Sequence, residues 1–187
     1  TRGTVLVDRK NLWKGKPLKS LTIGKHSTGG RNNLGRITSR HKGAGHKNKY
    51  REIDFYRKKD DIKAKIERIE YDPNRSAHVA LIKYEDGAMN YILAPNKIKV
   101  GDEIVSGRSK KIEIGNCMPL SDIPAGTDIH NIELSPNGGG KIARSAGSSA
   151  QISGIDDNYC IIKLKSGEIR KVISTARATI GIVSNSD

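Results

Sequence analysis

Apolar and polar residues alternate along the chain after residue 60. In the segment "DIKAKIERIEYDP" the apolar positions are Ile62, Ala64 and Ile66, followed by Ile69 and Tyr71. A period of two is typical of a strand that buries one face and exposes the other. This stretch is therefore predicted to form a half-buried strand.

Further short strands follow, each ended by a turn. Residues 78–95 contain two apolar runs separated by Glu85-Asp86-Gly87, and Asp-Gly is the strongest short hairpin signal. A turn and another strand follow in 97–107. We predict a small antiparallel barrel over residues 61–112, of the OB-fold type, although periodicity alone is equally compatible with any β-meander.

The pattern resumes after a linker rich in turn residues, near residues 110–115. Strands are predicted over 128–134 and 178–185, with a hairpin over 159–173 that turns at Ser166-Gly167. A second small barrel fits residues 113–187. No long helical pattern is visible, and the spacing of the turns indicates an all-β protein.

Composition agrees with this class and limits the alternatives. Hydrophobic residues make up 35% of the 187 residues and aromatic residues only 4%. Isoleucine dominates the apolar set, and branched side chains of this kind suit strands. No apolar run approaches the ~18 residues of a membrane span, and no signal-peptide core is visible.

Charge divides the chain into two unequal parts. Residues 1–60 contain 17 Lys and Arg against 4 Asp and Glu, whereas residues 61–187 contain 17 against 16. The first part is predicted to be a basic extension on a nearly neutral body. Such a segment repels itself without a counter-charge, and a polyanion supplies one while it releases counterions. Nucleic acid is the favoured partner; a membrane surface is disfavoured because the segment has no amphipathic helix.

The type of nucleic acid follows from the glycines. Residues 29–45 contain five of them, which would weaken a DNA-recognition helix, and no zinc finger or heptad repeat is visible. Extended Gly- and Arg-rich segments that become ordered on binding are typical of proteins that thread into folded RNA. The few apolar residues of the segment are interpreted as anchors toward the barrel: Leu34, Ile37, Ile53 and Phe55.

Catalytic and metal chemistry find little support. Cys117 and Cys160 lie far apart without nearby ligands, so two reduced thiols are expected, with a disulfide as the alternative. His78 and His130 fall in predicted strands and are interpreted as structural. "PNGGGKIA" lacks the spacing and the Ser or Thr of a phosphate loop, and the spacing "HKGAGH" lacks further metal ligands. The protein is predicted not to be an enzyme.

Several separate blocks resemble one known family. "GGRNNLGRITSRHKGAGHKNKYREIDFYR", "GNCMPLSDIPAGTDIHNIEL", "GGGKIARSAGSSAQI" and "ARATIGIVSN" are similar to the universal ribosomal large-subunit protein L-two family over almost the whole chain. The resemblance implies a basic rRNA-binding extension (1–60), an OB-fold barrel (61–112) and an SH3-like barrel (113–187). It also implies binding to large-subunit rRNA near the peptidyl-transferase region, other large-subunit proteins as partners, and a role in subunit assembly and association. A free-standing RNA-binding OB/SH3 module is the alternative.

The predicted RNA-binding residues lie in the extension and in one later loop. In the extension they are Arg31, Asn32, Asn33, Arg36, Arg40, His41, Lys42, His46, Lys47, Lys49, Tyr50, Arg51, Arg57 and Lys58. In the loop they are Lys141, Arg144 and Ser145, beside the small residues Ala146 and Gly147 that would let an RNA backbone approach. No cofactor is expected, although structural Mg²⁺ ions that bridge to rRNA are compatible with the sequence.

The family pattern continues beyond this sequence. Its members carry a Gly-, Arg- and His-rich tail with a block like "NPVDHPHGGG", which does not follow Asp187 here. Two expectations are a trimmed chain and, preferred, a separate chain that supplies the tail. The Ile-rich and Asn/Lys-rich composition, with "TGGRNNLGRITSRH", favours a mitochondrial ribosome, with a bacterial cytoplasm as the alternative.

Overall fold

The computed structural model describes residues 10–24, 27–43, 45–46 and 48–186. Within these ranges the regular elements are fourteen strands and two short 3-10 helices. The helices are η1 (Lys19–Leu21) and η2 (Leu120–Asp122). None of the described helices is long and apolar enough to cross a membrane. The predicted all-β class is confirmed.

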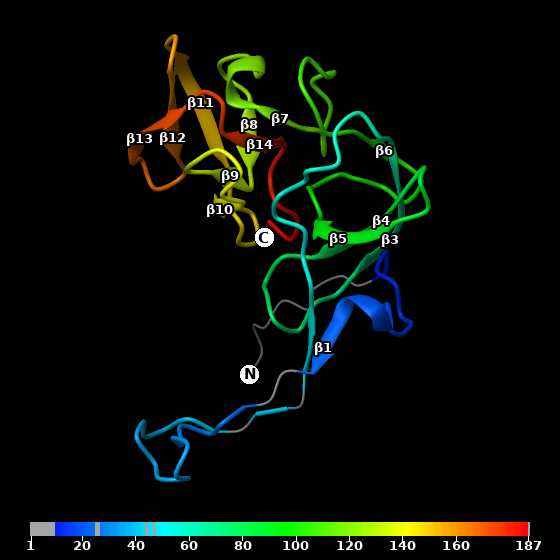
Figure 1. Ribbon diagram of the computed structural model, residues 1–187, viewed down its shortest axis with the longest axis vertical. Helices are drawn as coiled ribbons and strands as arrows, with labels where there is room; N and C mark the ends of the chain where they lie inside the picture. The colour runs from blue at the N-terminus through cyan, green and yellow to red at the C-terminus, as the bar shows by residue number, and fades with distance from the viewer. Residues whose placement is uncertain (1–9, 25–26, 44, 47, 187) are drawn as a thin grey trace, which may run out of the picture.

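The first barrel unit is a curled antiparallel sheet with the order β5-β4-β3-β6 (Figure 1). Its strands are β3 (Ala64–Glu70), β4 (Val79–Tyr84), β5 (Met89–Leu93) and β6 (Glu103–Ile104). The predicted hairpin at Asp86-Gly87 joins β4 to β5, and Gly87 adopts φ +85° there. An L-residue with a side chain is strained at such an angle, which is why this turn type uses glycine.

A β-bulge explains the irregular spacing of apolar residues in β3. Ile66 pairs with Ile82, but the register shifts before Arg68, which pairs with Leu81. One extra residue on the bulged strand reverses which side chains face the core. The jump from Ile66 to Ile69 in the sequence is the trace of this bulge.

Both faces of the sheet are covered. One face packs a core that contains Ile66, Ile82 and Ile104. The other face buries Val79, Leu81 and Tyr91 under the partly buried Leu18, Leu21, Ile53 and Met89. β4 is therefore buried at almost every position, which is typical of a strand with two covered faces.

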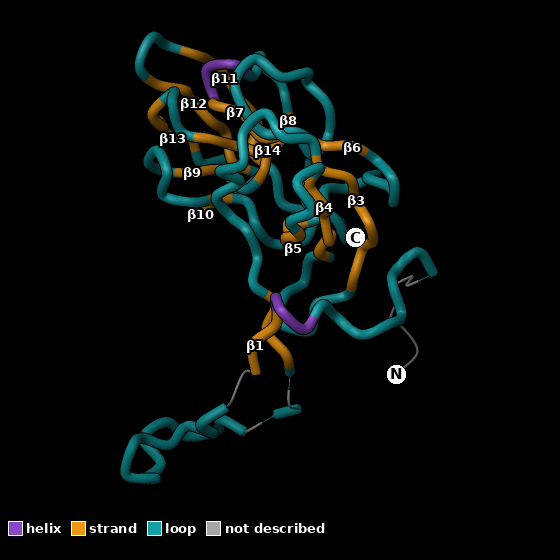
Figure 2. The backbone as a smooth tube through the Cα atoms, turned by 45° about the vertical axis from the view of Figure 1, so that its right-hand side comes forward, coloured by secondary structure: helices purple, strands orange, loops and turns teal. Residues whose placement is uncertain are grey.

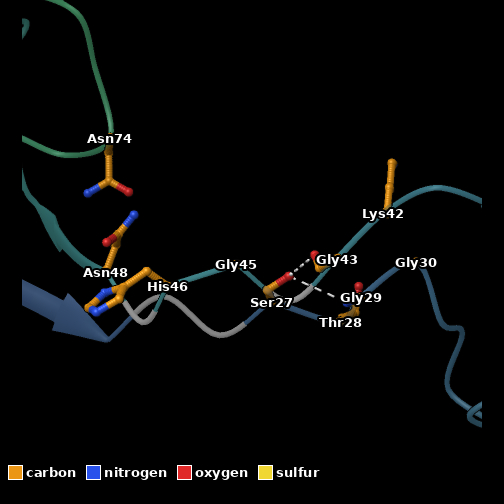
Figure 3. Close-up of a pocket in the computed structure, with 10 residues that line it drawn as sticks. All are labelled: Ser27, Thr28, Gly29, Gly30, Lys42, Gly43, Gly45, His46, Asn48 and Asn74. Carbon is orange, nitrogen blue, oxygen red and sulfur yellow. Dashed lines mark hydrogen bonds between the residues drawn. The ribbon is translucent and has the colours of Figure 1, made fainter. Parts of the chain in front are cut away.

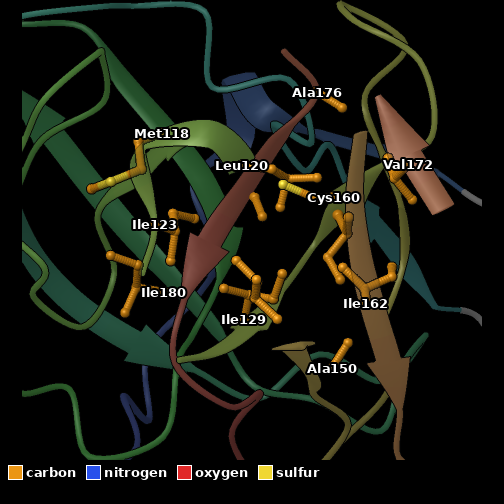
Figure 4. Close-up of a cluster of buried hydrophobic side chains, with 13 residues drawn as sticks. Met118, Leu120, Ile123, Ile129, Ala150, Cys160, Ile162, Val172, Ala176 and Ile180 are labelled. Carbon is orange, nitrogen blue, oxygen red and sulfur yellow. The ribbon is translucent and has the colours of Figure 1, made fainter. Parts of the chain in front are cut away.

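The second unit contains a six-stranded sheet with the order β13-β12-β11-β8-β14-β7. Its strands are β7 (Cys117–Pro119), β8 (Asp128–His130), β11 (Ala150–Ile155), β12 (Tyr159–Leu164), β13 (Ile169–Ile173) and β14 (Arg177–Ile180). β9 (Ile132–Glu133) and β10 (Gly140–Ile142) form a separate pair. The sheet curls around a core of small and branched side chains, shown in Figure 4. This is the SH3-like unit, and the predicted hairpin at Ser166-Gly167 joins β12 to β13.

Two predicted strands are wrong in detail. The last one, predicted over 178–185, is β14 and ends at Ile180. Residues 128–134 do not form a single strand, because Asn131 adopts φ +50° between β8 and β9. β8 pairs with β11 and β14, whereas β9 pairs with β10. The kink sends the chain from one sheet to the other.

The two cysteines are free and buried, and burial raises the pKa of both thiols. His130 is also buried, and its Nδ1 lies 2.8 Å from the Gly181 carbonyl oxygen. Because a carbonyl can only accept, Nδ1 carries the proton. Burial lowers the pKa of His130 to about 4, so the side chain is neutral and structural, as predicted.

Candidate nucleic-acid interface

The basic extension forms a long hairpin that projects from the first barrel unit (Figures 1 and 2). Its base is an antiparallel pair, β1 (Thr22–Gly24) and β2 (Lys49–Arg51). We call the described residues between these strands the arm. From residue 25 to residue 51 the sequence contains no Asp or Glu. The arm therefore presents a single sign of charge, away from both sheets.

The tip of the arm is held by its own hydrogen bonds. Arg31 and Ile37 form an antiparallel bridge. The Asn32 Oδ1 accepts hydrogen bonds from the backbone N–H groups of Leu34 and Arg36, each at 3.0 Å, and the Asn32 carbonyl accepts from the Gly35 N–H at 3.0 Å. An Asn side chain that bonds to the backbone two residues on stabilises a turn. The tip is thus preorganised rather than a loose loop.

A second turn lies just behind the tip. The Gly30 carbonyl accepts from the Thr38 N–H at 2.9 Å and the Ser39 N–H at 3.1 Å, while Gly30 adopts φ +74°. A Cβ at residue 30 would lie only 2.3 Å from the Ser39 carbonyl oxygen. Glycine is required here by both the angle and the close approach.

The two limbs of the arm, together with Asn74, line an open polar hollow of about 620 Å³ (Figure 3). It is lined by Ser27, Thr28, Gly29, Gly30, Lys42, Gly43, Gly45, His46, Asn48 and Asn74. The Ser27 hydroxyl spans the limbs by donating to the Gly43 carbonyl at 3.5 Å. At the barrel end, the Asn74 side-chain amide donates to the Lys49 carbonyl at 2.8 Å.

Most predicted contact residues of the arm and of the start of β2 are exposed. This set comprises Arg31, Asn32, Asn33, Arg36, Arg40, His41, Lys42, His46 and Lys49, while Tyr50 is half-buried. Lys47 lies outside the described residues. Their side chains are available for phosphates, sugars and base edges, the groups that dominate binding to RNA.

Arg51 has a different environment. It is 7% exposed, and its Nε donates to the Glu70 Oε2 at 3.0 Å, with Asp72 3.7 Å from its Nη1. The Glu70 Oε1 also accepts from Arg68 and from the Tyr91 hydroxyl. Arg51 thus joins β2 to β3 within a buried ion cluster. Its observed partners give it a structural role, and an RNA contact by this residue stays a prediction.

Arg57 is buried as well, at the junction of the two barrel units. Its Nε donates to the Ser106 hydroxyl at 3.2 Å, and both Nη atoms donate to the Gly115 carbonyl at 3.3 Å. Arg177 from β14 donates to the Arg57 carbonyl at 3.1 Å. The neighbouring Lys58 is exposed, with its Nζ 4.9 Å from the centre of the Tyr56 ring. Of these two predicted contacts, only Lys58 faces outward.

The second predicted loop lies beside the segment that follows the arm. Arg144 is exposed and stacks on Phe55 at 4.8 Å, and its Nη1 donates to the Gly140 carbonyl. Lys141 and Ser145 are exposed nearby. The structure therefore brings this loop next to Phe55, just after the arm, although about 90 residues separate Phe55 from Arg144 in the sequence.

Arg75 packs under this surface, with its side chain 17% exposed, and was not predicted. Its guanidinium lies 5.7 Å from the Tyr50 ring and 6.0 Å from the Phe55 ring, and its Nε donates to Asp72 at 2.6 Å. The sequence "DPNRSA" was interpreted only as a turn. The sequence does show a basic residue in that turn, but its position between the two predicted RNA-binding regions depends on tertiary packing.

The interpretation of the apolar residues is half wrong. Ile53 and Phe55 pack on the barrel units, as predicted. Leu34 and Ile37 do not: they are 73% and 62% exposed in the arm. They cannot anchor the extension, because the arm projects away from the barrel at that point.

Metal binding finds no support in the described part of the chain. No group of three or more His, Cys, Asp or Glu side chains is close enough there to hold an ion. The exposed His41 and His46 thus belong to no such group within these ranges.

Comparison with known families identifies the family of the chain that contains this arm. Residues 18–106 match the model for the "Ribosomal Proteins L2, RNA binding N-terminal domain", and residues 113–187 match the "Ribosomal Proteins L2, C-terminal domain". The chain belongs to the ribosomal protein L2 family. This is a family of ribosomal proteins and not of enzymes, as the sequence predicted.

Curated members of the L2 family support the assignment over the whole chain. The protein is 63% identical over 186 residues to the large ribosomal subunit protein uL2 of Granulibacter bethesdensis, and 61% identical over 188 residues to that of Pelagibacter ubique. The uL2 protein of Rickettsia typhi is 59% identical over 186 residues. Each match covers 100% of this chain and 67–68% of the relative. The sequence thus spans about two thirds of the length of these L2 proteins.

Proposed function

We propose that this chain is a structural constituent of the large ribosomal subunit that binds large-subunit rRNA. The observation that carries the proposal is the exposed, acid-free arm, which lies within the match to an RNA-binding domain of ribosomal proteins L2. Phosphate contacts from the arm supply most of the affinity, and the shape of the folded RNA supplies the specificity.

The two basic regions act as one surface in this proposal. The arm inserts between RNA segments, while Arg144 and Lys141 face the RNA beside the base of the arm. Stacking on Phe55 holds Arg144 in place and leaves its remaining N–H groups free for phosphate or base edges. Structural Mg²⁺ ions would bridge the remaining phosphates to the protein.

The finer assignments rest on the family resemblance and on composition. We place the binding site near the peptidyl-transferase region, with a role in subunit assembly and association. Other large-subunit proteins are the expected partners. The ribosome is of bacterial type, as are the relatives. For its compartment we propose the mitochondrial matrix, with a bacterial cytoplasm as the alternative; cell fractionation followed by immunodetection would distinguish them.

Substitution of basic arm residues tests rRNA binding. We expect the triple variant Arg36→Ala, Arg40→Ala, Lys47→Ala to bind an in vitro transcript of the large-subunit rRNA more weakly. The slope of log K against log[salt] should fall by roughly 0.7–0.9 for each lost phosphate contact. Filter binding from low to high KCl measures both quantities. Binding unchanged in affinity and slope would remove the basis of the proposal.

Sedimentation separates a ribosomal component from a free-standing RNA-binding module. The chain should stay with the large subunit through a high-salt wash, whereas a free-standing module would be released.

A further inference from the structure

Two large apolar side chains stand in the most basic part of the molecule. Leu34 is 73% exposed and Ile37 is 62% exposed, and neither belongs to any of the apolar clusters of the described chain. Single exposed apolar residues are ordinary on protein surfaces. Here two of them lie in the turn of the arm held by Asn32 and Arg31, and the arm projects from the first barrel unit (Figures 1 and 2).

The tip holds these side chains in a fixed frame. The Leu34 N–H is bonded to the Asn32 Oδ1, and Ile37 is bridged to Arg31 across the hairpin. The N–H groups of Gly35 and Arg36 are also bonded within the turn. Little loop entropy remains to be lost when the tip is buried, so contact made by its apolar side chains adds to affinity with a small ordering cost.

We propose that Leu34 and Ile37 form an apolar contact with unstacked nucleobases of the rRNA. The charges around them select the partner: Arg31, Arg36 and Arg40 flank the pair, and no Asp or Glu lies between residues 25 and 51. If the tip docked on an apolar patch of another protein, these three arginines would lie at the edge of the contact without negative partners. An RNA supplies phosphates for the arginines and flat base faces for the aliphatic side chains.

The proposal also specifies the type of RNA. In a continuous A-form helix the base faces are stacked, and the deep major groove excludes side chains. Base faces become accessible in loops, bulges and junctions. The tip is therefore directed at an unpaired region of the rRNA, and not at the backbone of a regular helix. This inference rests on the proposed rRNA binding and adds a contact that depends on apolar area instead of charge.

The double variant Leu34→Ala, Ile37→Ala tests the contact, because neither side chain supports the fold. We expect its affinity for a transcript of the large-subunit rRNA to fall about tenfold or more, since buried apolar area is lost. The salt slope should stay that of the wild type, because no phosphate contact is removed. The conservative variant Leu34→Met, Ile37→Val should retain most of the affinity. Val100→Ala is the matched control, an apolar residue 57% exposed outside the arm, and should change nothing.

The outcomes separate this contact from the proposed function. Wild-type affinity in the double variant, together with weaker binding by Arg36→Ala, Arg40→Ala, would overturn the apolar contact and leave rRNA binding intact. It would also be the result if the tip docks on a protein, since the transcript contains none. A loss of affinity with a shallower salt slope would also overturn the proposal, because it would mean that phosphate contacts of the arginines were lost and not apolar contact alone. If neither double variant binds more weakly, the proposed function itself fails.

Discussion

The substitution Glu70→Gln tests how β2, at the base of the arm, is held to β3 of the first barrel unit. Glu70 is 1% exposed, and it accepts hydrogen bonds from Arg51 at 3.0 Å, Arg68 at 2.7 Å and the Tyr91 hydroxyl at 2.9 Å. A glutamine amide offers an acceptor on one side only. Its NH₂ group must then face the guanidinium of either Arg51 or Arg68, and two donors cannot satisfy each other.

The loss in free energy of unfolding depends on which partners of Arg51 and Arg68 remain after the substitution. Removing one partner of a buried ion pair destabilises a protein by about 3–5 kcal/mol. Two features favour the lower end of that range: Asp72 still lies 3.7 Å from Arg51, and the side chain of Arg68 is 22% exposed and can reach water. We expect the free energy of unfolding to fall by about 3 kcal/mol, which lowers the melting temperature of a chain of this size by about 6–12 °C.

Urea denaturation and thermal melting of the wild type and two variants measure this effect. The matched control is Glu103→Gln, which removes an exposed pair in the same sheet: Lys63 Nζ lies 3.5 Å from the Glu103 carboxylate, and both side chains are more than half exposed. That loss should be below about 1 kcal/mol. If Glu70→Gln is no more destabilising than Glu103→Gln, the buried cluster does not hold β2 to β3 and the reasoning is refuted.

Two further predictions concern the arm and the second barrel unit. Gly30→Ala should weaken rRNA binding about tenfold while the melting temperature stays unchanged, because its Cβ collides with the Ser39 carbonyl in the arm alone; Gly24→Ala, with open space around its Cβ, is the control, and equal binding by both would contradict the role of this turn. His130 is neutral when folded with a pKa of about 4, and unfolding returns its pKa to about 6.5. Its contribution to stability is therefore complete above pH 6.5 and is lost as the pH falls toward 4. Urea unfolding at stepped pH should show a steeper loss in the wild type than in His130→Gln, by on the order of 3 kcal/mol across this window, and parallel curves would refute the buried neutral imidazole.

The elements that depend on local chemistry were predicted from the sequence. Asp86-Gly87 and Ser166-Gly167 turn where expected, because Gly87 and Gly167 supply the positive φ that such turns need. The family signature likewise indicated the L2 domains, which the comparisons confirm. The break at Asn131 could not be predicted, because it serves a tertiary contact: Gly140 approaches so closely that a Cβ there would lie 2.1 Å from the Asn131 Oδ1.

Charge in the sequence indicated the partner but not the orientation of each side chain. Arg51 and Arg57 belong to the same basic extension as Arg36 and Arg40, yet their partners lie far along the chain: Glu70 for Arg51, and the Gly115 carbonyl for Arg57. A local count of basic residues therefore overestimates the charge that can face RNA. It also misses that Arg75, outside the basic extension, packs against Tyr50 and Phe55 while it pairs with Asp72.

The boundary of the RNA-facing arm follows from this distinction. Through Lys49 the described basic side chains of the arm are exposed, whereas at Arg51 the guanidinium turns inward to Glu70. Within β2 the environment of the basic side chains therefore changes: Lys49 is exposed to solvent, whereas Arg51 pairs with Glu70 and fixes the direction of the arm. Since an arm that swings freely would have to be ordered on binding, we expect the buried Arg51–Glu70 pair to support rRNA affinity by fixing the arm's direction.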